Sequence, residues 1–321
     1  MSTMNAALVT SFDEPPHYRT FTAPVPHGDE AVVEMVAVGL HPRVRSGASG
    51  SHYTSTGVLP LVPGVDGVGR RRDGALVYFV TDDDQQGTMA ERAVVDPRRS
   101  IVLPEGTDAV AVAAAMNPAM SSWVALRRRV PLVPGQSVLV LGATGNAGTM
   151  AVQVARLLGA GRIVGAGRDR ARLDALHGVG ADEVVALTDD VEATRHRLAR
   201  AASEVDVVLD YLWGQPTEHA IPALLRARED RNRPLDWVQI GAVAGADIQL
   251  PSAALRSANL RLLGSGQGSV SPQGYLAELP SLVAAIGSGD IAVRTRTVAL
   301  RDIEAAWVAG DEPGVRTVVV P

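Results

Sequence analysis

Three glycines follow an apolar run of the chain at intervals of three residues, and they constrain the fold more than any other feature. The apolar run spans residues 137–141, and the glycines are Gly142, Gly145 and Gly148. After them, residues 149–158 place apolar side chains at helical spacing. A glycine inside regular structure costs about 0.5–1 kcal/mol relative to alanine, so we expect these positions to require it. We predict a strand, a tight turn and a helix here.

Such a turn can hold the phosphates of a nucleotide. The first amide groups of a helix point outward without partners, and the helix dipole favours an anion there. A bulky side chain would block a pyrophosphate, whereas glycine lets it touch the backbone, and Gly148 would let the helix pack closely on the strand. The pattern is G-x-x-G-x-x-G, with Ala143 at the second position, and a tight turn without a ligand is the alternative. The residues predicted to bind a dinucleotide are Gly142, Ala143, Gly145, Asn146, Ala147 and Gly148.

Strand and helix patterns alternate from about Ser121 onward. The strand candidates are apolar without a polar face, which is typical of a parallel sheet covered on both sides. Six such strands fit a doubly wound domain. They are residues 137–141, 162–166, 183–186, 205–210, 236–240 and 260–263.

The chain on either side of this region has short β-like runs bounded by Gly, Pro and Asp, which favour a small barrel or sandwich. These runs are residues 5–9, 31–38, 67–70, 75–80 and 89–95, and then 292–299 and 316–320. Helices are predicted at residues 121–129, 272–286 and 301–309. We therefore predict an α/β protein. Residues 1–120 and 269–321 form a β domain, and residues 121–268 form a dinucleotide-binding domain inserted into it.

The composition excludes several kinds of chemistry. The chain has no cysteine, which removes disulfides, thiolate catalysis and cysteine-bound zinc. The chain also has no lysine, and all 30 residues counted as Lys or Arg are arginine. A bias in genomic base composition would account for this. The absence of lysine still excludes Schiff-base chemistry and a phosphate-loop lysine. The net charge of -5 gives no reason to expect nucleic acid or an anionic membrane as a partner. Because neither a signal peptide nor an uninterrupted apolar run of about 18 residues is visible, we expect a cytoplasmic protein without a membrane span.

The residue that ends the second strand indicates which dinucleotide binds. A cofactor with a free ribose 2′-hydroxyl usually meets an acidic residue at this place, whereas the chain has Arg168. A guanidinium offers several donors to a 2′-phosphate, and Arg172 lies close behind. The alternative is that these arginines are solvated helix residues. We predict NADPH as the cofactor.

Segments along the whole chain resemble one known family. In order they are MNAALVTSFDEPP, LPLVPGVDGVGR, GTMAERAVVD, SSWVALRRRVPLVPGQSVLVLGATGNAG, GADEVVAL, VDVVLDYLWG, LLGSG and AAIGSGDI. The chain resembles the zinc-independent quinone oxidoreductase and enoyl reductase branch of the medium-chain dehydrogenase/reductase superfamily. The resemblance implies a GroES-like β domain interrupted by a Rossmann domain of six parallel strands, with the active site in the cleft between them.

The resemblance also implies that no metal is bound. Zinc-dependent relatives hold their catalytic metal with a cysteine, the histidine of a Gly-His-Glu segment and one further ligand. The corresponding stretch here is Gly64-Val65-Asp66, and cysteine is absent. Alcohol oxidation through a zinc alkoxide is therefore not expected.

Without a metal, a side chain must supply a proton or a hydrogen bond as hydride arrives. The family segment R-S-G-x-Y corresponds to RSG at residues 45–47, followed by extra residues before Tyr53. Tyr53 takes the place of the family tyrosine, and His41 stands where the family often has asparagine. The insertion leaves the register of the loop open. Tyr53, His41 and His52 are therefore alternative proton donors, and a plain packing role for Tyr53 is the other possibility.

Other residues carry over from the resemblance as cofactor contacts. Ser121 aligns with the family threonine that packs near the nicotinamide. Asp210 ends the fourth strand, where it either lies beside the cofactor or caps the turn. Trp213 and Tyr78 either line an apolar cleft or belong to the core. The turns after the fifth and sixth strands add Gly241, Ala242, Gly264, Ser265 and Gly266.

The predicted function is an NADPH-dependent, metal-free oxidoreductase that transfers hydride to a quinone or an α,β-unsaturated carbonyl compound. An enoyl-thioester reductase is the alternative within this chemistry, for which Asn117-Pro118 before Ser121 is a mild hint. A weakly catalytic NADPH-binding protein, used as a redox sensor or structural protein, is the alternative outside it. The resemblance implies a homodimer, alone or within a tetramer, paired through the edge strand at residues 260–263.

Overall fold

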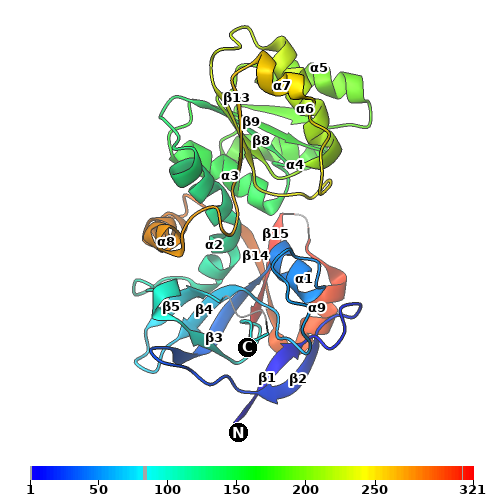
Figure 1. Cartoon of the computed structure of the whole chain (residues 1–321). Helices are drawn as coiled ribbons and strands as arrows, with labels where there is room; N and C mark the ends of the chain where they lie inside the picture. The colour runs from blue at the N-terminus through cyan, green and yellow to red at the C-terminus, as the bar shows by residue number, and fades with distance from the viewer. Residues whose placement is uncertain (1, 82–84, 313) are drawn as a thin grey trace. The chain divides into compact units, whose positions relative to one another are not determined.

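The computed structural model describes residues 2–81, 85–312 and 314–321, and the chain divides into two compact units (Figure 1). Residues 1–118 and 272–321 form unit 1, and residues 119–271 form unit 2. Unit 2 is thus an insertion between the two segments of unit 1. The long helix α2 (Ala109–Val124) and the π-helical turn η2 (Ala125–Arg129) carry the chain from the first segment into unit 2.

Unit 2 contains a six-stranded parallel sheet with the strand order β10-β9-β8-β11-β12-β13. Numbered along the chain, this order is 3-2-1-4-5-6, which confirms the predicted doubly wound domain. The strands and helices are β8 (Ser137–Leu141), α3 (Asn146–Leu157), β9 (Arg162–Gly167), α4 (Arg170–Ala175), η3 (Leu176–Val179), β10 (Glu183–Ala186), α5 (Val191–Ala202), β11 (Val207–Asp210), α6 (Gly214–Ala227), β12 (Leu235–Gln239), α7 (Ser252–Ser257) and β13 (Leu260–Gly264).

The central strand shows why these residues form a sheet covered on both sides. Val138, Leu139, Val140 and Leu141 are all fully buried, so side chains pointing to either face are excluded from water. On one face Leu139 and Leu141 belong to one apolar cluster with residues of α5 and α6 and with Trp237. The glycine turn follows directly from this strand.

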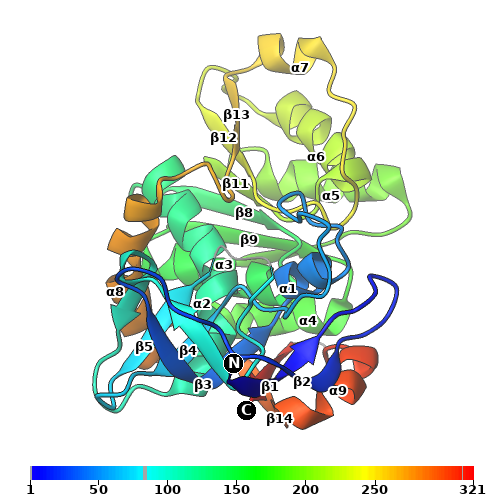
Figure 2. The same ribbon diagram turned by 60° about the horizontal axis from the view of Figure 1, so that its bottom comes forward.

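The register of the sheet brings the ends of three strands to one edge. Leu141 at the end of β8 pairs with Ala166 of β9 and with Asp210 of β11. Figure 2 shows β8 between these two neighbours. The chain continues from β8 to one side of the sheet and reaches β11 on the other, so the topological switch point lies between β8 and β11. Ligands of such sheets bind outside the carboxyl ends of the strands at this point.

Unit 1 is built on a seven-stranded mixed sheet with the order β14-β15-β3-β4-β5-β7, in which β6 also pairs with β3, and on the hairpin β1-β2. Its apolar core lies between these strands and the helices α1 and α9. The elements are β1 (Thr3–Leu8), β2 (His17–Thr22), β3 (Ala31–Leu40), α1 (Pro42–Ala48), β4 (Asp66–Arg70), β5 (Leu76–Val80), β6 (Arg92–Val95), η1 (Pro97–Arg99), β7 (Ser100–Val102), α8 (Pro272–Gly287), β14 (Arg294–Ala299), η4 (Leu300–Asp302), α9 (Ile303–Ala309) and β15 (Val315–Val320).

Several elements differ from the sequence predictions, and α1, β2 and α2 are the clearest cases. Residues 41–53, which we interpreted as a loop, contain the short helix α1. Strand β2 was not predicted, because most of its side chains are exposed and show no alternation of apolar and polar residues. Helix α2 begins twelve residues before the predicted start at Ser121, because its alanine-rich segment is apolar on every side and gives no amphipathic period. By length and composition Ala109–Arg129 could cross a membrane, yet 67% of its most apolar window is buried inside the protein, as in a core helix.

Candidate functional site

The glycine turn between β8 and α3 contains two glycines that the protein itself requires. Gly142 has a φ of 86°, a conformation that favours glycine. A Cβ on Gly148 would lie 2.2 Å from the Gly142 carbonyl oxygen, so helix α3 can approach the turn this closely only with glycine there. This contact supports the packing role predicted for Gly148.

Gly145 differs from these two glycines. Its φ is an ordinary -77°, and a Cβ on it would have the Gly142 carbonyl oxygen, 3.4 Å away, as its nearest neighbour. The residue is exposed, and as the N-cap of α3 it offers no side chain to the amide groups of the first helical turn. The fold therefore leaves room at Gly145, directly before the positive end of the α3 dipole. An anion can approach the backbone there.

The other residues of the turn lie in different surroundings. Asn146 and Ala147 form the first turn of α3 and are partly exposed. Ala143 is fully buried, so its side chain lies inside the fold, and its amide donates to the Ala166 carbonyl. Of the six predicted residues, Ala143 thus has no surface to offer a cofactor.

Arg168 follows β9 at the same edge of the sheet and is exposed. In the described part of the chain, no hydrogen bond or ion pair is found for its guanidinium. The neighbouring carboxylate of Asp169 accepts from the Arg172 amide at 3.1 Å and caps α4, which gives this acidic side chain a structural role. The Arg172 Nη2 lies 3.5 Å from the Asn146 Oδ1, so a second guanidinium reaches the first turn of α3. The surroundings of the turn are therefore cationic.

Asp210 at the end of β11 is fully buried, and its carboxylate accepts four hydrogen bonds. Oδ1 accepts from the amides of Leu212 and Trp213 at 2.9 and 3.0 Å. Oδ2 accepts from Thr217 Oγ1 at 2.6 Å and from Trp237 Nε1 at 2.9 Å. The side chain has no surface for a cofactor, and of the two roles considered for Asp210 this geometry corresponds to capping of the turn.

Tyr211, the next residue, was not singled out from the sequence. Its hydroxyl lies 2.9 Å from the Ser121 Oγ, the position predicted to lie near the nicotinamide. Burial raises the pKa of Tyr211 to about 12, even though hydrogen bonds with Ser121 and Ser122 favour the charged form. The phenol therefore stays protonated at neutral pH. A tyrosine directly after a buried strand at a ligand-binding edge was the available signal.

The turns after β12 and β13 complete this edge of unit 2. The Gly241 amide donates to the Asp210 carbonyl, and a Cβ on Gly241 would lie 2.8 Å from the Tyr211 carbonyl oxygen. Ala242 is exposed. Gly264, Ser265 and Gly266 follow β13, where Ser265 is buried and its amide donates to the Gln239 carbonyl. These predicted residues therefore share the carboxyl-end edge of the sheet with the glycine turn.

Among the proton-donor candidates in unit 1, His41 belongs to a buried polar cluster. The His41 Nε2 lies 3.0 Å from the Asp66 Oδ1, and the Tyr78 hydroxyl donates to the Asp66 Oδ2 at 2.7 Å. Burial, together with the charge and the hydrogen bond of Asp66, raises the pKa of Tyr78 well above its usual value. Tyr78 is thus a core residue that remains a donor. No local pattern in the sequence indicates this cluster, because the three residues stand on separate elements.

The cluster fixes which nitrogen of His41 carries a proton. A carboxylate only accepts hydrogen bonds, so the Nε2 bears the proton that faces Asp66. The Nδ1 is buried and has no hydrogen-bond partner in the part of the chain that the structure describes. It can therefore accept from a ligand in the neutral form, or donate to one when the ring is protonated.

Tyr53 and His52 lie in different surroundings from His41. Tyr53 is 73% exposed, and its ring centroid is 4.2 Å from that of His52. The His52 Nδ1 lies 2.9 Å from the Thr54 Oγ1. Burial first, and then the positive charge of Arg43, lowers the pKa of His52 to about 4. His52 is therefore neutral at neutral pH and is poorly suited to act there as a cationic acid.

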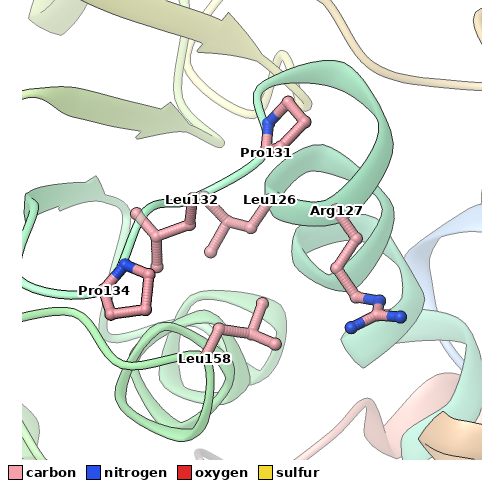
Figure 3. A pocket seen from close by; sticks show the side chains of 6 residues that line it. All are labelled: Leu126, Arg127, Pro131, Leu132, Pro134 and Leu158. Atoms are coloured by element: carbon pink, nitrogen blue, oxygen red, sulfur yellow. The ribbon is translucent and has the colours of Figure 1, made fainter.

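No cluster of three or more histidine, aspartate or glutamate side chains that could hold a metal occurs among residues 2–81, 85–312 and 314–321. A pocket of about 330 Å³ does lie in unit 2, where the chain enters β8 and α3 ends. Figure 3 shows Leu126, Leu132 and Leu158 facing its interior while the Arg127 guanidinium extends away from them. Because this pocket adjoins the amino end of β8, it is separate from the edge that carries the glycine turn.

Comparisons with known proteins place the chain in a family. The zinc-binding dehydrogenase family profile matches residues 147–284. A probable NADPH-dependent quinone reductase of Emericella nidulans is 30% identical over 361 aligned positions, which cover 99% of this chain and 100% of that protein. The protein belongs to the quinone oxidoreductase branch of the medium-chain dehydrogenase/reductase superfamily. This branch was the one predicted from the ordered sequence segments, and membership makes the protein an oxidoreductase.

Two further relatives of this quinone oxidoreductase branch are similar to the chain. A quinone oxidoreductase of Pongo abelii is 32% identical over 147 residues, which cover 42% of this chain and 44% of that protein. The quinone oxidoreductase of Thermus thermophilus, whose structure was also determined in complex with NADPH, superposes with a TM-score of 0.82 at 26% identity. The superposition covers 99% of this chain and 100% of that one. These comparisons support binding of a nicotinamide cofactor.

Proposed function

We propose that this oxidoreductase is NADPH-dependent and metal-free, and that it transfers hydride to a quinone or an α,β-unsaturated carbonyl compound. The observation that carries the proposal is the space at Gly145, directly before the N-terminus of α3. Neither the backbone angle nor the packing requires glycine at this position, so a ligand that touches the backbone accounts for it. A pyrophosphate is the chemical group that suits this space.

The cationic surroundings of the turn support NADPH over NADH. Arg168 ends the strand next to β8, and Arg172 reaches the first turn of α3. Guanidinium groups match a phosphate with several donors at once. The carboxylate of Asp169, which directly follows Arg168 in the chain, caps α4 instead. Bound NADPH would supply the hydride, and the residues described here would bind and orient it.

His41 is the proton donor that the geometry favours, with Tyr53 as the second candidate. Asp66 orients the imidazole, and the Nδ1 is left without a protein partner among the described residues. A protonated His41 could therefore give its Nδ1 proton to an acceptor oxygen as negative charge develops there. The ring of Tyr53, by contrast, is exposed and lies beside His52 rather than against a buried carboxylate.

Turnover with a panel of acceptors tests the proposal. The panel holds quinones, enones and an enoyl thioester, and oxidation of NADPH is followed for each after dialysis against a chelator. We expect turnover with quinones or enones, no loss on chelation and no stoichiometric zinc by elemental analysis. Turnover with the thioester alone would favour the enoyl-thioester reductase. Tight NADPH binding without turnover on any acceptor would favour a sensor, and one zinc per chain would refute metal independence.

A further inference from the structure

The segment that follows β11 lies at the switch point of the sheet in unit 2. β8 and β11 are neighbours, so the glycine turn after β8 and Tyr211–Gly214 after β11 emerge at the same edge. Ligands of doubly wound sheets bind at this place. The phosphate part of the proposed cofactor site uses the turn after β8 at Gly145 and the arginines after β9. The segment after β11 is available for another part of the ligand.

Trp213 has a backbone conformation that is almost confined to glycine. Its φ of 54° and ψ of -162° lie in a region that residues with a Cβ rarely occupy. Trp213 is the one non-glycine residue with positive φ among the residues that the structure describes. Its amide donates to the buried Asp210 carboxylate, whose three other hydrogen bonds hold it in place. The surrounding structure therefore imposes a strained backbone on Trp213.

Packing alone does not explain a tryptophan at this strained position. The side chain is only partly buried, so the fold gains less from it than from a core aromatic such as Trp237. Glycine would adopt the same backbone without strain. Strained residues at ligand-binding edges commonly serve the ligand. An indole that is partly exposed at the switch point can contact a flat aromatic ring.

Tyr211 connects this segment to the glycine turn after β8 and to the turn after β12, which contains Gly241. A Cβ on Gly142 would lie 3.2 Å from the Tyr211 Cβ, and a Cβ on Gly241 would lie 2.8 Å from the Tyr211 carbonyl oxygen. The glycines on either side thus leave space for Tyr211. Its hydroxyl pairs with that of Ser121 at 2.9 Å. The tyrosine therefore holds Ser121 beside the same edge.

We propose that Trp213 contacts the nicotinamide ring of the cofactor and that Tyr211 positions Ser121 next to that ring. The inference rests on the proposed function, because it assumes a nicotinamide cofactor bound through the glycine turn. It assigns the segment after β11 to the nicotinamide half, whereas Gly145 and Arg168 serve the phosphates.

Binding of two probes to Trp213→Gly tests the role of the indole. The probes are NADPH and 2′-phospho-ADP-ribose, which lacks the nicotinamide. We expect the variant to bind NADPH about tenfold more weakly, as for the loss of a well-placed aromatic contact, and to bind the fragment as the wild type does. Trp213→Phe should recover most of the NADPH affinity. Equal affinities of wild type and Trp213→Gly for NADPH, or equal weakening for both probes, would overturn the proposal.

A comparison with Trp213→Ala separates the strain from the contact. Both variants lack the indole, but only alanine keeps a Cβ in the glycine region. We therefore expect Trp213→Gly to unfold at a temperature at least about 2–4 °C above that of Trp213→Ala. If the wild type binds neither probe, the proposed function fails as well. If the wild type binds both probes and the Trp213 variants bind each probe with the same affinity as the wild type, only the assigned role of Trp213 fails.

Kinetics of Tyr211→Phe test the positioning role. The variant keeps the ring but loses the hydroxyl, so we expect a several-fold lower kcat with little change in melting temperature. Ser121→Ala should give a similar loss, and the double variant should lose no more than either single variant, because both changes remove the same pair. Tyr18→Phe, at a partly exposed tyrosine of unit 1, is the matched control. Additive losses, or an unchanged kcat in Tyr211→Phe, would overturn this role.

Discussion

Two alanine substitutions in the glycine turn should have opposite effects on folding and on cofactor binding. At Gly145 the backbone angle is ordinary and the nearest atom to a new Cβ would be 3.4 Å away. The gain from lower unfolded-state entropy, about 0.4–1 kcal/mol, roughly offsets the loss at an N-cap position. We therefore expect Gly145→Ala to change the free energy of unfolding by less than about 0.5 kcal/mol. At Gly148 the Cβ would lie 2.2 Å from a backbone oxygen, and overpacking of this kind costs about 1–3 kcal/mol or more.

The affinity for NADPH should distinguish Gly145→Ala from Gly148→Ala in the opposite way, because Gly145→Ala, which changes stability little, should bind NADPH more weakly. The methyl group of Gly145→Ala would occupy the space that we assign to the pyrophosphate. Losing one charge-assisted hydrogen bond to a phosphate costs about 1.5–3 kcal/mol, or roughly a 10- to 100-fold weaker Kd for NADPH. Calorimetric titration with NADPH and thermal unfolding of both variants would measure the two effects. A Gly145→Ala variant that binds NADPH as tightly as the wild type would refute the assignment. A Gly148→Ala variant as stable as the wild type would refute the packing argument.

Four further predictions concern other parts of the molecule. Arg168→Ala should lose most of a preference for NADPH over NADH, by about 10- to 100-fold, and equal wild-type affinities for the two cofactors would contradict the assignment. His41→Gln should lower kcat about 10²-fold or more on an enone and less on a quinone, which accepts hydride more readily; a larger loss in Tyr53→Phe would make the tyrosine the donor instead. Because the pKa of His52 is lowered to about 4, the unfolded chain binds the proton first as pH falls from about 6.5. The free energy of unfolding should therefore fall progressively as the pH is lowered from about 6.5 to about 4, because the folded chain disfavours protonated His52. In His52→Gln, which has no such proton to bind, this part of a plot of stability against pH should be flatter. We propose a homodimer paired through β13, where Leu262 is 38% exposed on an edge strand, so Leu262→Arg should yield monomers by light scattering; a wild-type monomer at micromolar concentration would refute the pairing.

The sheet of unit 2 could be predicted from the sequence because its strands are buried on both faces. Such strands are short apolar runs, and turn residues separate them from the helices. β8 and β10 have the predicted bounds, and the other four strands lie within two residues of them. The glycine turn was also recognisable, because a positive φ favours glycine at Gly142 and the close backbone contact at Gly148 leaves no room for another residue type.

Features that depend on tertiary contacts could not be predicted in the same way. His41 and Asp66 are 25 residues apart in the sequence, and nothing local indicates that a strand pairing brings their side chains to 3.0 Å. The role of Asp210 was left open because a carboxylate at a strand end can face a ligand or the turn. Its four donors come from the turn, α6 and β12, and only the folded chain brings them together.

The insertion of unit 2 also sets the order in which the chain can fold as it is synthesised. Strand β3 of unit 1 pairs with β6 through residues 31–34 and with β15 only through residues 38–40, so this last part of β3 stays without its partner until residues 315–320 have left the ribosome. At about 5–20 residues per second this takes roughly 15–60 s. All of unit 2 emerges within this interval, and its parallel sheet can form before unit 1 is complete. The unpaired end of β3 at residues 38–40 is therefore a place where a nascent chain would be open to chaperones or to wrong pairing with another chain.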